Sequence, residues 1–252
     1  MRNIFLKLAY LGTDYYGSQL QDKPGVSEPT VQAALETALQ KLFKRKIRPT
    51  FSSRTDRGVH ALAQGVNFKI DSPVPLANIK RALNVYLPPD IRVLAVKQVP
   101  LDFHARFSAK DKTYRYIIVN SQYPDVLMHE RAWHVQYRRL DVNLMKKAAA
   151  KLVGKKDFKV LAKEAKKYQD TRRNMLAINI KKRGRFIYID LQAQGFLHNM
   201  ARNIVSMLAE CGSKRIKPTQ IPAILTGKAQ YHSRPAPAVG LYLQQINYKN
   251  RI

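Results

Sequence analysis

One short segment of this chain concentrates side chains that could do chemistry. The sequence SRTDRGVH (residues 53–60) holds one carboxylate, two guanidinium groups and one imidazole. It fits a surface turn in which Asp56 accepts a backbone hydrogen bond and Gly58 takes a positive φ. It fits a reactive site equally well. Acids are scarce in this chain and a carboxylate between two arginines weakens phosphate binding, so Asp56 suggests a use other than attraction.

The charge balance indicates the class of partner. Lys and Arg total 45 against 17 Asp and Glu, which gives a formal net charge of +28. Such a surface attracts phosphate, so a nucleic acid is the first expected partner and an anionic membrane surface the second. The membrane is disfavoured because no stretch approaches the roughly 18–20 apolar residues that span a bilayer, and the basic residues are spread along the whole chain.

The compartment follows from two further features. No secretory signal is visible at the start of the sequence, so we expect a cytoplasmic protein. The single cysteine, Cys211, excludes an internal disulfide and a thiolate metal cluster, and packing is its expected role.

The elements around Asp56 are predicted from periodicity. Alternating apolar residues predict strands over residues 4–10 and 66–70, with a short strand ending at Phe51 between them. Helical spacing predicts a helix that Pro29 starts and a second helix over 76–86, followed by a strand over 91–99. The order is β-α-β-β-α-β, which is the ferredoxin-like arrangement also used by RNA-binding RRM domains.

The second half repeats this pattern loosely. We predict strands over 113–120, 133–135, 175–182, 186–194 and 240–248, with helices over 142–152, over 198–211 and from 219. The expected fold class is therefore α+β, with two ferredoxin-like (RRM-like) halves, 1–105 and 106–252, whose antiparallel sheets join side by side with the active-site cleft between them.

Six segments in chain order resemble motifs of the tRNA pseudouridine synthase A family. They are LGTDYYG (11–17), SRTDRGVH (53–60), FHARFS (103–108), KTYRY (112–116), GFLHNMARN (195–203) and APAVGLYL (236–243). Any one of them could occur by chance, but six at fitting spacings make a strong identification. The resemblance implies that a tRNA uridine is isomerised without a redox cofactor or a metal: the C1′–N1 bond breaks, the uracil rotates, and C5 joins C1′.

The resemblance also assigns roles to residues. It makes Asp56 the catalytic carboxylate, stacks Tyr114 on the target uracil, and lets Arg54 occupy the gap that the flipped nucleotide leaves. Without it, a strand tyrosine is usually core and Arg202 would be a solvated arginine. With it, Arg202 pairs with Asp56 in the pocket. The residues that the resemblance places at the substrate are Tyr114, Arg54, Arg202, His60 and Leu243.

Two segments are expected to contact the RNA more widely. Their residues are Phe103, His104, Ala105, Arg106 and Phe107 in the first, and Gln169, Arg172 and Arg173 in the second. The first could also be a hinge between the halves, and the second could be an ordinary solvated face. By the resemblance, the substrate is the anticodon stem-loop of tRNA at positions 38, 39 and 40, and the protein is a homodimer.

The chain departs from the family pattern at four positions. Ser18 stands where an aromatic residue is usual, Ser53 and Ser206 where glycine is usual, and Arg57 where a small residue is usual. Asp56 is in place, so the departures bear on substrate choice. A non-catalytic RNA-binding protein on the same scaffold is the main alternative. A metal-dependent nuclease using Asp56 and His60 is a weaker one, because no clustered carboxylates offer a Mg²⁺ site.

Overall fold

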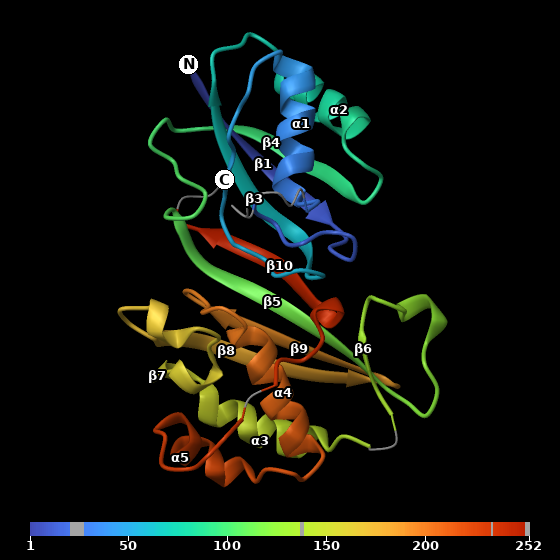
Figure 1. Cartoon of the computed structure of the whole chain (residues 1–252), viewed down its shortest axis with the longest axis vertical. Coiled ribbons are helices and arrows are strands. Elements are labelled where there is room, and N and C mark those ends of the chain that lie inside the picture. Colours follow the sequence, from blue (N-terminus) through green and yellow to red (C-terminus); the bar gives the residue numbers. More distant parts are fainter. Residues whose placement is uncertain (21–27, 137–138, 233, 250–252) are drawn as a thin grey trace. The chain divides into compact units, whose positions relative to one another are not determined.

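The chain folds as two compact units. The computed structural model describes residues 1–20, 28–136, 139–232 and 234–249 (Figure 1). The first unit consists of Met1–Lys110 and the chain from Tyr242 onward, and the second of Asp111–Leu241. This division differs from the expected 1–105 and 106–252, because the last strand joins the sheet of the first unit.

The sheet of the first unit contains the strands that were expected in this part of the chain, together with β10. β1 (Arg2–Tyr10) lies between β4 (Ile91–Val99) and β3 (His60–Ile70) and is antiparallel to both. β2 (Thr50–Phe51) pairs antiparallel with β3 at Val66 and Asn67. β10 (Leu241–Tyr248) pairs parallel with β3 through Tyr242 and Leu243, opposite His60 and Ala61.

Two helices complete the first unit. α1 (Val31–Phe43) and α2 (Leu76–Tyr86) pack against each other beside the sheet (Figure 1). Thr30 caps α1, and its side chain accepts a hydrogen bond from the Ala33 N–H, so Pro29 precedes the cap instead of starting the helix. The core is formed by helix and strand residues that are fully buried, among them Leu35, Leu39, Leu83, Ile4, Leu6 and Leu8.

The second unit has a sheet of the same kind. Its strands follow the order β5 (Ala109–Asn120), β9 (Phe186–Ala193), β8 (Arg172–Arg183) and β7 (Gly154–Asp157), each antiparallel to its neighbours. β6 (Trp133–Val135) pairs parallel with the end of β5. The helices are α3 (Val142–Leu152), α4 (Met200–Gly212) and α5 (Ile221–Leu225). Short 3-10 turns are Val126–Met128, Lys159–Leu161, Ala165–Lys167, Pro218–Gln220 and Ala238–Gly240.

The predicted α+β class is confirmed, and the two units share an architecture. In the second unit, β5, α3, β8, β9 and α4 follow one another as β1, α1, β2, β3 and α2 do in the first. In the first unit β3 lies between β1 and β2, and in the second unit β9 lies between β5 and β8 in the same way. None of the described helices is long and apolar enough to cross a membrane.

Candidate active site and RNA-binding residues

Asp56 lies in a tight loop between β2 and β3. Its carbonyl accepts a hydrogen bond from the Val59 N–H at 3.1 Å, and Gly58 has a φ of +77°, which confirms the expected turn. Thr55 and Val59 are buried, Arg54 and Arg57 are exposed, and Asp56 itself is partly exposed. The loop therefore alternates anchored residues with residues that reach the surface.

The residue before Asp56 is clamped from two sides. The Ser18 hydroxyl accepts a hydrogen bond from the Thr55 N–H at 2.9 Å, and the Ser18 N–H donates to the Thr55 carbonyl at 3.1 Å. The hydroxyls of Tyr10 and Thr55 are 2.9 Å apart. Ser18 is fully buried, so this serine holds the loop that carries Asp56 from inside the unit.

Gln64 fixes the loop on its other flank. Its side-chain oxygen accepts hydrogen bonds from the Ser52 hydroxyl (2.8 Å) and the Ser53 N–H (3.3 Å). Its amide nitrogen donates to the Ser53 carbonyl (2.7 Å) and to the Tyr10 hydroxyl (3.4 Å). Gln64 is fully buried, so these bonds form away from water. Backbone anchors on both sides of Arg54 therefore leave Asp56 little freedom to shift.

A neighbouring loop closes against this turn. Gly17 has a φ of +102°, and a Cβ there would lie 2.7 Å from the Thr55 carbonyl oxygen, so only glycine fits. The Gly58 N–H donates to the Tyr15 carbonyl at 3.3 Å. The Arg57 guanidinium lies 3.9 Å from the centre of the Tyr16 ring, a cation–π contact that joins the two loops.

His60 and Leu243 lie inside the first unit. His60 is fully buried, its Nδ1 accepts a hydrogen bond from the Gly12 N–H at 2.9 Å, and its ring centre is 4.7 Å from that of Tyr242. Leu243 is also fully buried, opposite Ala61 of β3. We therefore expect both residues to act by holding the loops around Asp56, and not by touching the substrate as the resemblance implies.

The buried Tyr10 hydroxyl, which contacts this loop, makes the stability of the protein depend on pH in the alkaline range. Burial raises the pKa of Tyr10 from 10.0 to about 12, while hydrogen bonds with Thr55 and Gln64 act in the opposite direction. Because the folded pKa is the higher one, this contribution to stability is complete below pH 10 and is lost as the pH rises toward 12.

We expect Tyr10→Phe to change that pH dependence. Between pH 10 and 12, the wild type should lose about 2–3 kcal/mol more free energy of unfolding than the variant. At neutral pH, the variant should be the less stable protein by about 1 kcal/mol, since it lacks the hydroxyl contacts. Urea unfolding across this range measures the difference. Parallel stability curves would show that the Tyr10 hydroxyl is not held as described.

The segment around His104 presents aromatic and basic groups at the surface. Ala105 is fully buried, and Phe103 packs edge-on against Phe5 with ring centres 5.8 Å apart. The rings of His104 and Phe107 lie 4.3 Å apart, and the Arg106 guanidinium lies 5.6 Å from the Phe107 ring. Phe107 is 69% exposed, so this cluster offers a flat apolar surface beside a positive charge.

Tyr114 and Arg202 belong to the second unit. Tyr114 lies on β5 opposite Leu191, is 5% exposed, and meets the Phe196 ring edge-on at 5.0 Å. Arg202, on α4, donates from Nε to the Ala236 carbonyl at 2.7 Å. A second donor of its guanidinium contacts the Asn199 side-chain oxygen at 3.3 Å. These contacts fix the direction of the arginine. That Asp56 meets Tyr114 and Arg202 remains a prediction.

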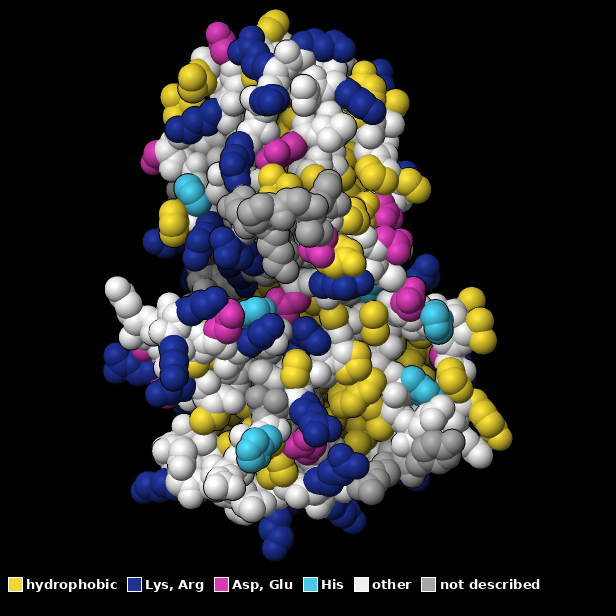
Figure 2. All heavy atoms as spheres, viewed as in Figure 1, with side chains coloured by type: hydrophobic (Ala, Val, Ile, Leu, Met, Phe, Trp, Pro, Cys, Tyr) yellow, Lys and Arg dark blue, Asp and Glu magenta, His cyan; other side chains and the backbone are white. Residues whose placement is uncertain are grey.

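The stretch over 169–173 leads into β8 and carries two arginines, Arg172 and Arg173, at the start of that strand. Gln169 and Arg172 are exposed, and the Arg172 Nε lies 3.1 Å from Asp170 Oδ1. The Arg173 guanidinium donates to the Asp170 carbonyl at 2.9 Å. Both arginines line a cavity of about 330 Å³ together with Lys155, Asn174, Gln194 and Gly195. On the face shown in Figure 2, Lys and Arg side chains outnumber Asp and Glu.

Known proteins match this chain over most of its length. The sequence matches the tRNA pseudouridine synthase family over residues 8–108 and 148–249. It is 40% identical to tRNA pseudouridine synthase A of Moorella thermoacetica, over 96% of this chain and 98% of that protein. The enzymes of the same name from Acetivibrio thermocellus (37% identical) and Thermoanaerobacter sp. strain X514 (39% identical) each cover 98% of this chain and are matched over 100% of their own length. The matched ranges contain Asp56 and Arg202, whereas Tyr114 lies between them.

Proposed function

Because this chain belongs to the tRNA pseudouridine synthase family, we propose that it isomerises uridine at positions 38, 39 and 40 of the tRNA anticodon stem-loop, with Asp56 as its essential carboxylate. The main structural support for the role of Asp56 is the way its loop is held. Buried hydrogen bonds from Ser18 and Gln64 anchor the backbone before it, and the carboxylate itself is partly exposed. A catalytic group needs this combination of fixed position and access.

The reaction gives the carboxylate a defined task. As the C1′–N1 bond breaks, the anomeric carbon becomes electron-poor, and a carboxylate beside it can capture or stabilise that centre. Asp56 can also serve by adding to the base or by assisting removal of a proton from the sugar. All three routes require an ionised carboxylate that stays in place beside the target nucleotide.

The other residues hold the nucleotide in this proposal. The Tyr114 ring stacks on the extruded uracil, and its edge-on contact with Phe196 supports that orientation. Arg54, which is exposed in the Asp56 loop, occupies the gap in the RNA. Arg202 pairs with Asp56 and keeps it ionised. The Ala236 and Asn199 contacts support this role by fixing its side chain.

The oligomeric state and the compartment of the protein belong to the same proposal. We infer a homodimer from the family resemblance, which sedimentation of the purified protein would detect as twice the mass of one chain. We also infer that the protein acts in the cytoplasm, where its tRNA substrate is available.

Mapping pseudouridine in tRNA tests the proposal. Purified protein incubated with unmodified tRNA should introduce pseudouridine at positions 38, 39 and 40, with no added cofactor and in the presence of a chelator. Binding of tRNA without pseudouridine formation would favour the non-catalytic RNA-binding protein. Strand cleavage that the chelator abolishes would favour the nuclease.

We expect Arg172→Ala or Arg173→Ala to weaken tRNA binding. Each lost phosphate contact should reduce the slope of log affinity against log salt by about one. The Arg172–Asp170 pair is exposed, so an incoming phosphate can displace it at little cost. Arg215→Ala is the matched control, since Arg215 is an exposed arginine of the same unit outside the cavity. Equal slopes for all variants and the wild type would remove residues 169–173 from the interface.

A further inference from the structure

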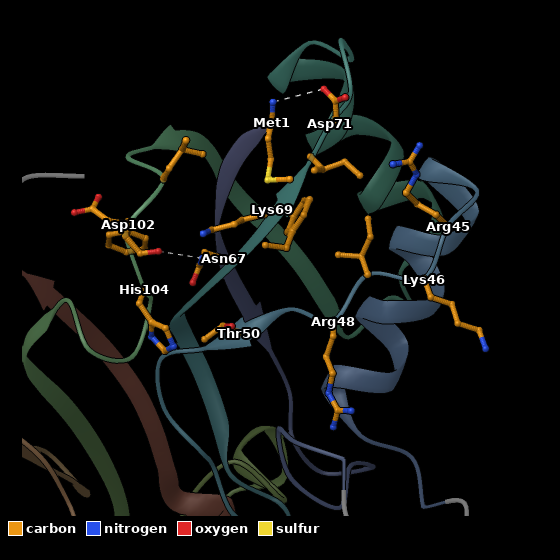
Figure 3. A pocket seen from close by; sticks show the side chains of 15 residues that line it. Met1, Arg45, Lys46, Arg48, Thr50, Asn67, Lys69, Asp71, Asp102 and His104 are labelled. Atoms are coloured by element: carbon orange, nitrogen blue, oxygen red, sulfur yellow. Dashed lines mark hydrogen bonds and ion pairs between the residues drawn. The ribbon is translucent and has the colours of Figure 1, made fainter.

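A second basic site lies in the first unit, at the end of β3 remote from Asp56. A cavity of about 540 Å³ is lined by residues 67–71 at the end of β3, by residues 45–48 after α1, and by residues 101–104 after β4. We call it the β3-end groove (Figure 3). Arg45 and Arg48 come from one side of the strand and His104 from the other, while Lys69 belongs to the strand itself.

The first wall of the groove exists because the β2–β3 ladder stops early. β2 pairs with β3 only through Thr50 and Phe51. The preceding residue is Pro49, which has no N–H to donate and so cannot extend a ladder. α1 ends at Phe43, and the next residue, Lys44, caps the helix in the left-handed conformation with a φ of 57°. Residues 45–48 therefore pass beside β3 without pairing to it, and a gap remains.

The second wall is fixed by two buried asparagines. The Asn3 side-chain nitrogen donates to the Phe103 carbonyl at 2.9 Å, and that of Asn67 donates to the same carbonyl at 3.3 Å. The Asn67 side-chain oxygen accepts from the Ala105 N–H at 2.8 Å. The backbone on both sides of His104 is thus held in place, so the groove is a built feature of the unit.

The groove carries excess positive charge. Arg45, Arg48 and Lys69 are exposed, and none of them forms an ion pair with a carboxylate in the part of the chain that the structure describes. Two acids, Asp71 and Asp102, also line the groove, and Asp71 faces the Met1 amino group at 3.6 Å. The cations stand on different segments and do not converge on one point, which suits successive phosphates of a polymer better than one small anion.

We propose that the β3-end groove binds the phosphate backbone of tRNA at nucleotides away from the uridine being modified, an inference that rests on the proposed function. His60, which follows the Asp56 loop, and Lys69 are nine residues apart on β3, or roughly 30 Å at the usual strand rise. A nucleotide at Asp56 cannot also fill this groove. The His104–Phe107 surface borders the groove and can receive an unpaired base.

Salt-dependent binding of tRNA tests the groove. We expect the double variant Arg48→Ala/Lys69→Ala to reduce the slope of log affinity against log salt by about 1.5–2, since two phosphate contacts are lost. The KM for tRNA should rise several-fold and kcat should stay unchanged, because the groove does not touch the reacting nucleotide. The matched control is Lys80→Ala/Arg81→Ala, which removes one lysine and one arginine from the exposed face of α2. If the salt slope and the KM change no more in the groove variant than in the control, the proposal is wrong.

A tethered cleavage reagent tests the location. Cys211 is fully buried, so a thiol introduced by Lys69→Cys can be labelled selectively with an iron chelate that generates hydroxyl radicals. We expect cuts in the tRNA backbone that Lys80→Cys does not give and that lie away from the modified uridine. Cuts only at the modified uridine, or the same cuts from both positions, would contradict the groove.

The two proposals fail separately. If the wild type binds tRNA but forms no pseudouridine, the proposed function is wrong, while the slope and the cuts still measure the groove. If pseudouridine forms normally and the groove variant keeps the wild-type slope, only the groove is wrong. Loss of binding to vesicles containing anionic phospholipid, with unchanged tRNA binding, would assign these residues to a membrane and would also overturn the proposal.

Discussion

Replacing Asp56 by asparagine should lower the turnover number for pseudouridine formation at least about a thousandfold, while tRNA binding is retained. The substitution keeps the size of the side chain and removes only its charge and its basicity. Binding should become slightly tighter, because a negative charge next to the RNA backbone is lost. Single-turnover assays with saturating enzyme separate the chemical step from binding, and filter binding measures affinity.

The control for Asp56 is a carboxylate on a helix of the same unit. Glu36→Gln makes the same isosteric change on α1, where Glu36 accepts a hydrogen bond from Gln32, and should leave turnover unchanged. If Asp56→Asn forms pseudouridine at the wild-type rate, the catalytic assignment is wrong. If both variants lose activity together, the loss reflects general sensitivity to charge.

Replacing Gln64 by methionine should give the second largest effect. The side chain keeps its length but loses four hydrogen bonds to Ser52, Ser53 and Tyr10. Buried donors and acceptors of the loop are left without these partners, so we expect the free energy of unfolding to fall by about 2–3 kcal/mol. The turnover number should fall about a hundredfold even below the melting temperature, because Asp56 is no longer held against the ribose.

Kinetics separate a positioning role for Gln64 from a merely structural one. If the variant is only partly folded, fewer molecules carry a working active site. Bound tRNA then favours the folded form, so kcat at saturating tRNA returns toward the wild-type value. A displaced Asp56 lowers kcat at saturating tRNA with little change in KM. Gln40→Met, an exposed position on α1, is the matched control. Full activity of Gln64→Met in its folded form would show that the loop holds Asp56 without this network.

Periodicity predicted most of the elements. The helices over 76–86 and 142–152 and the strand over 91–99 were predicted with the bounds that the structure has, because the apolar spacing is strong in all three. Prolines also flank the segments 76–86 and 91–99. β7 (Gly154–Asp157) was missed, since Gly-Lys-Lys-Asp has no apolar residue and is a strand only through pairing with β8. The place of β10 in the first unit depends on contacts between residues about 180 positions apart, which no local pattern contains.

The site was predicted in part. The motif containing Asp56 was recognisable from residue types, but the network that holds it was not, because serine and glutamine side chains are ordinary in loops. One signal was available: Gln64 has the same parity on β3 as Val66, Phe68 and Ile70, which predicts an inward direction for a polar side chain. The structure gives Ser18 a role that the sequence did not indicate. Considered from sequence as a lost aromatic contact, it is a buried hydrogen-bonding partner of Thr55.

The discontinuous first unit makes the order of synthesis matter. Tyr242 covers the ring of His60, and Tyr248 packs on Phe5 and Phe103, yet these tyrosines leave the ribosome after the entire second unit. A nascent chain can therefore contain the complete second unit before β10 has been made and can pair with β3. The His60 end of β3, which follows the Asp56 loop, should therefore reach its final packing only after Tyr242 and Leu243 have been synthesised.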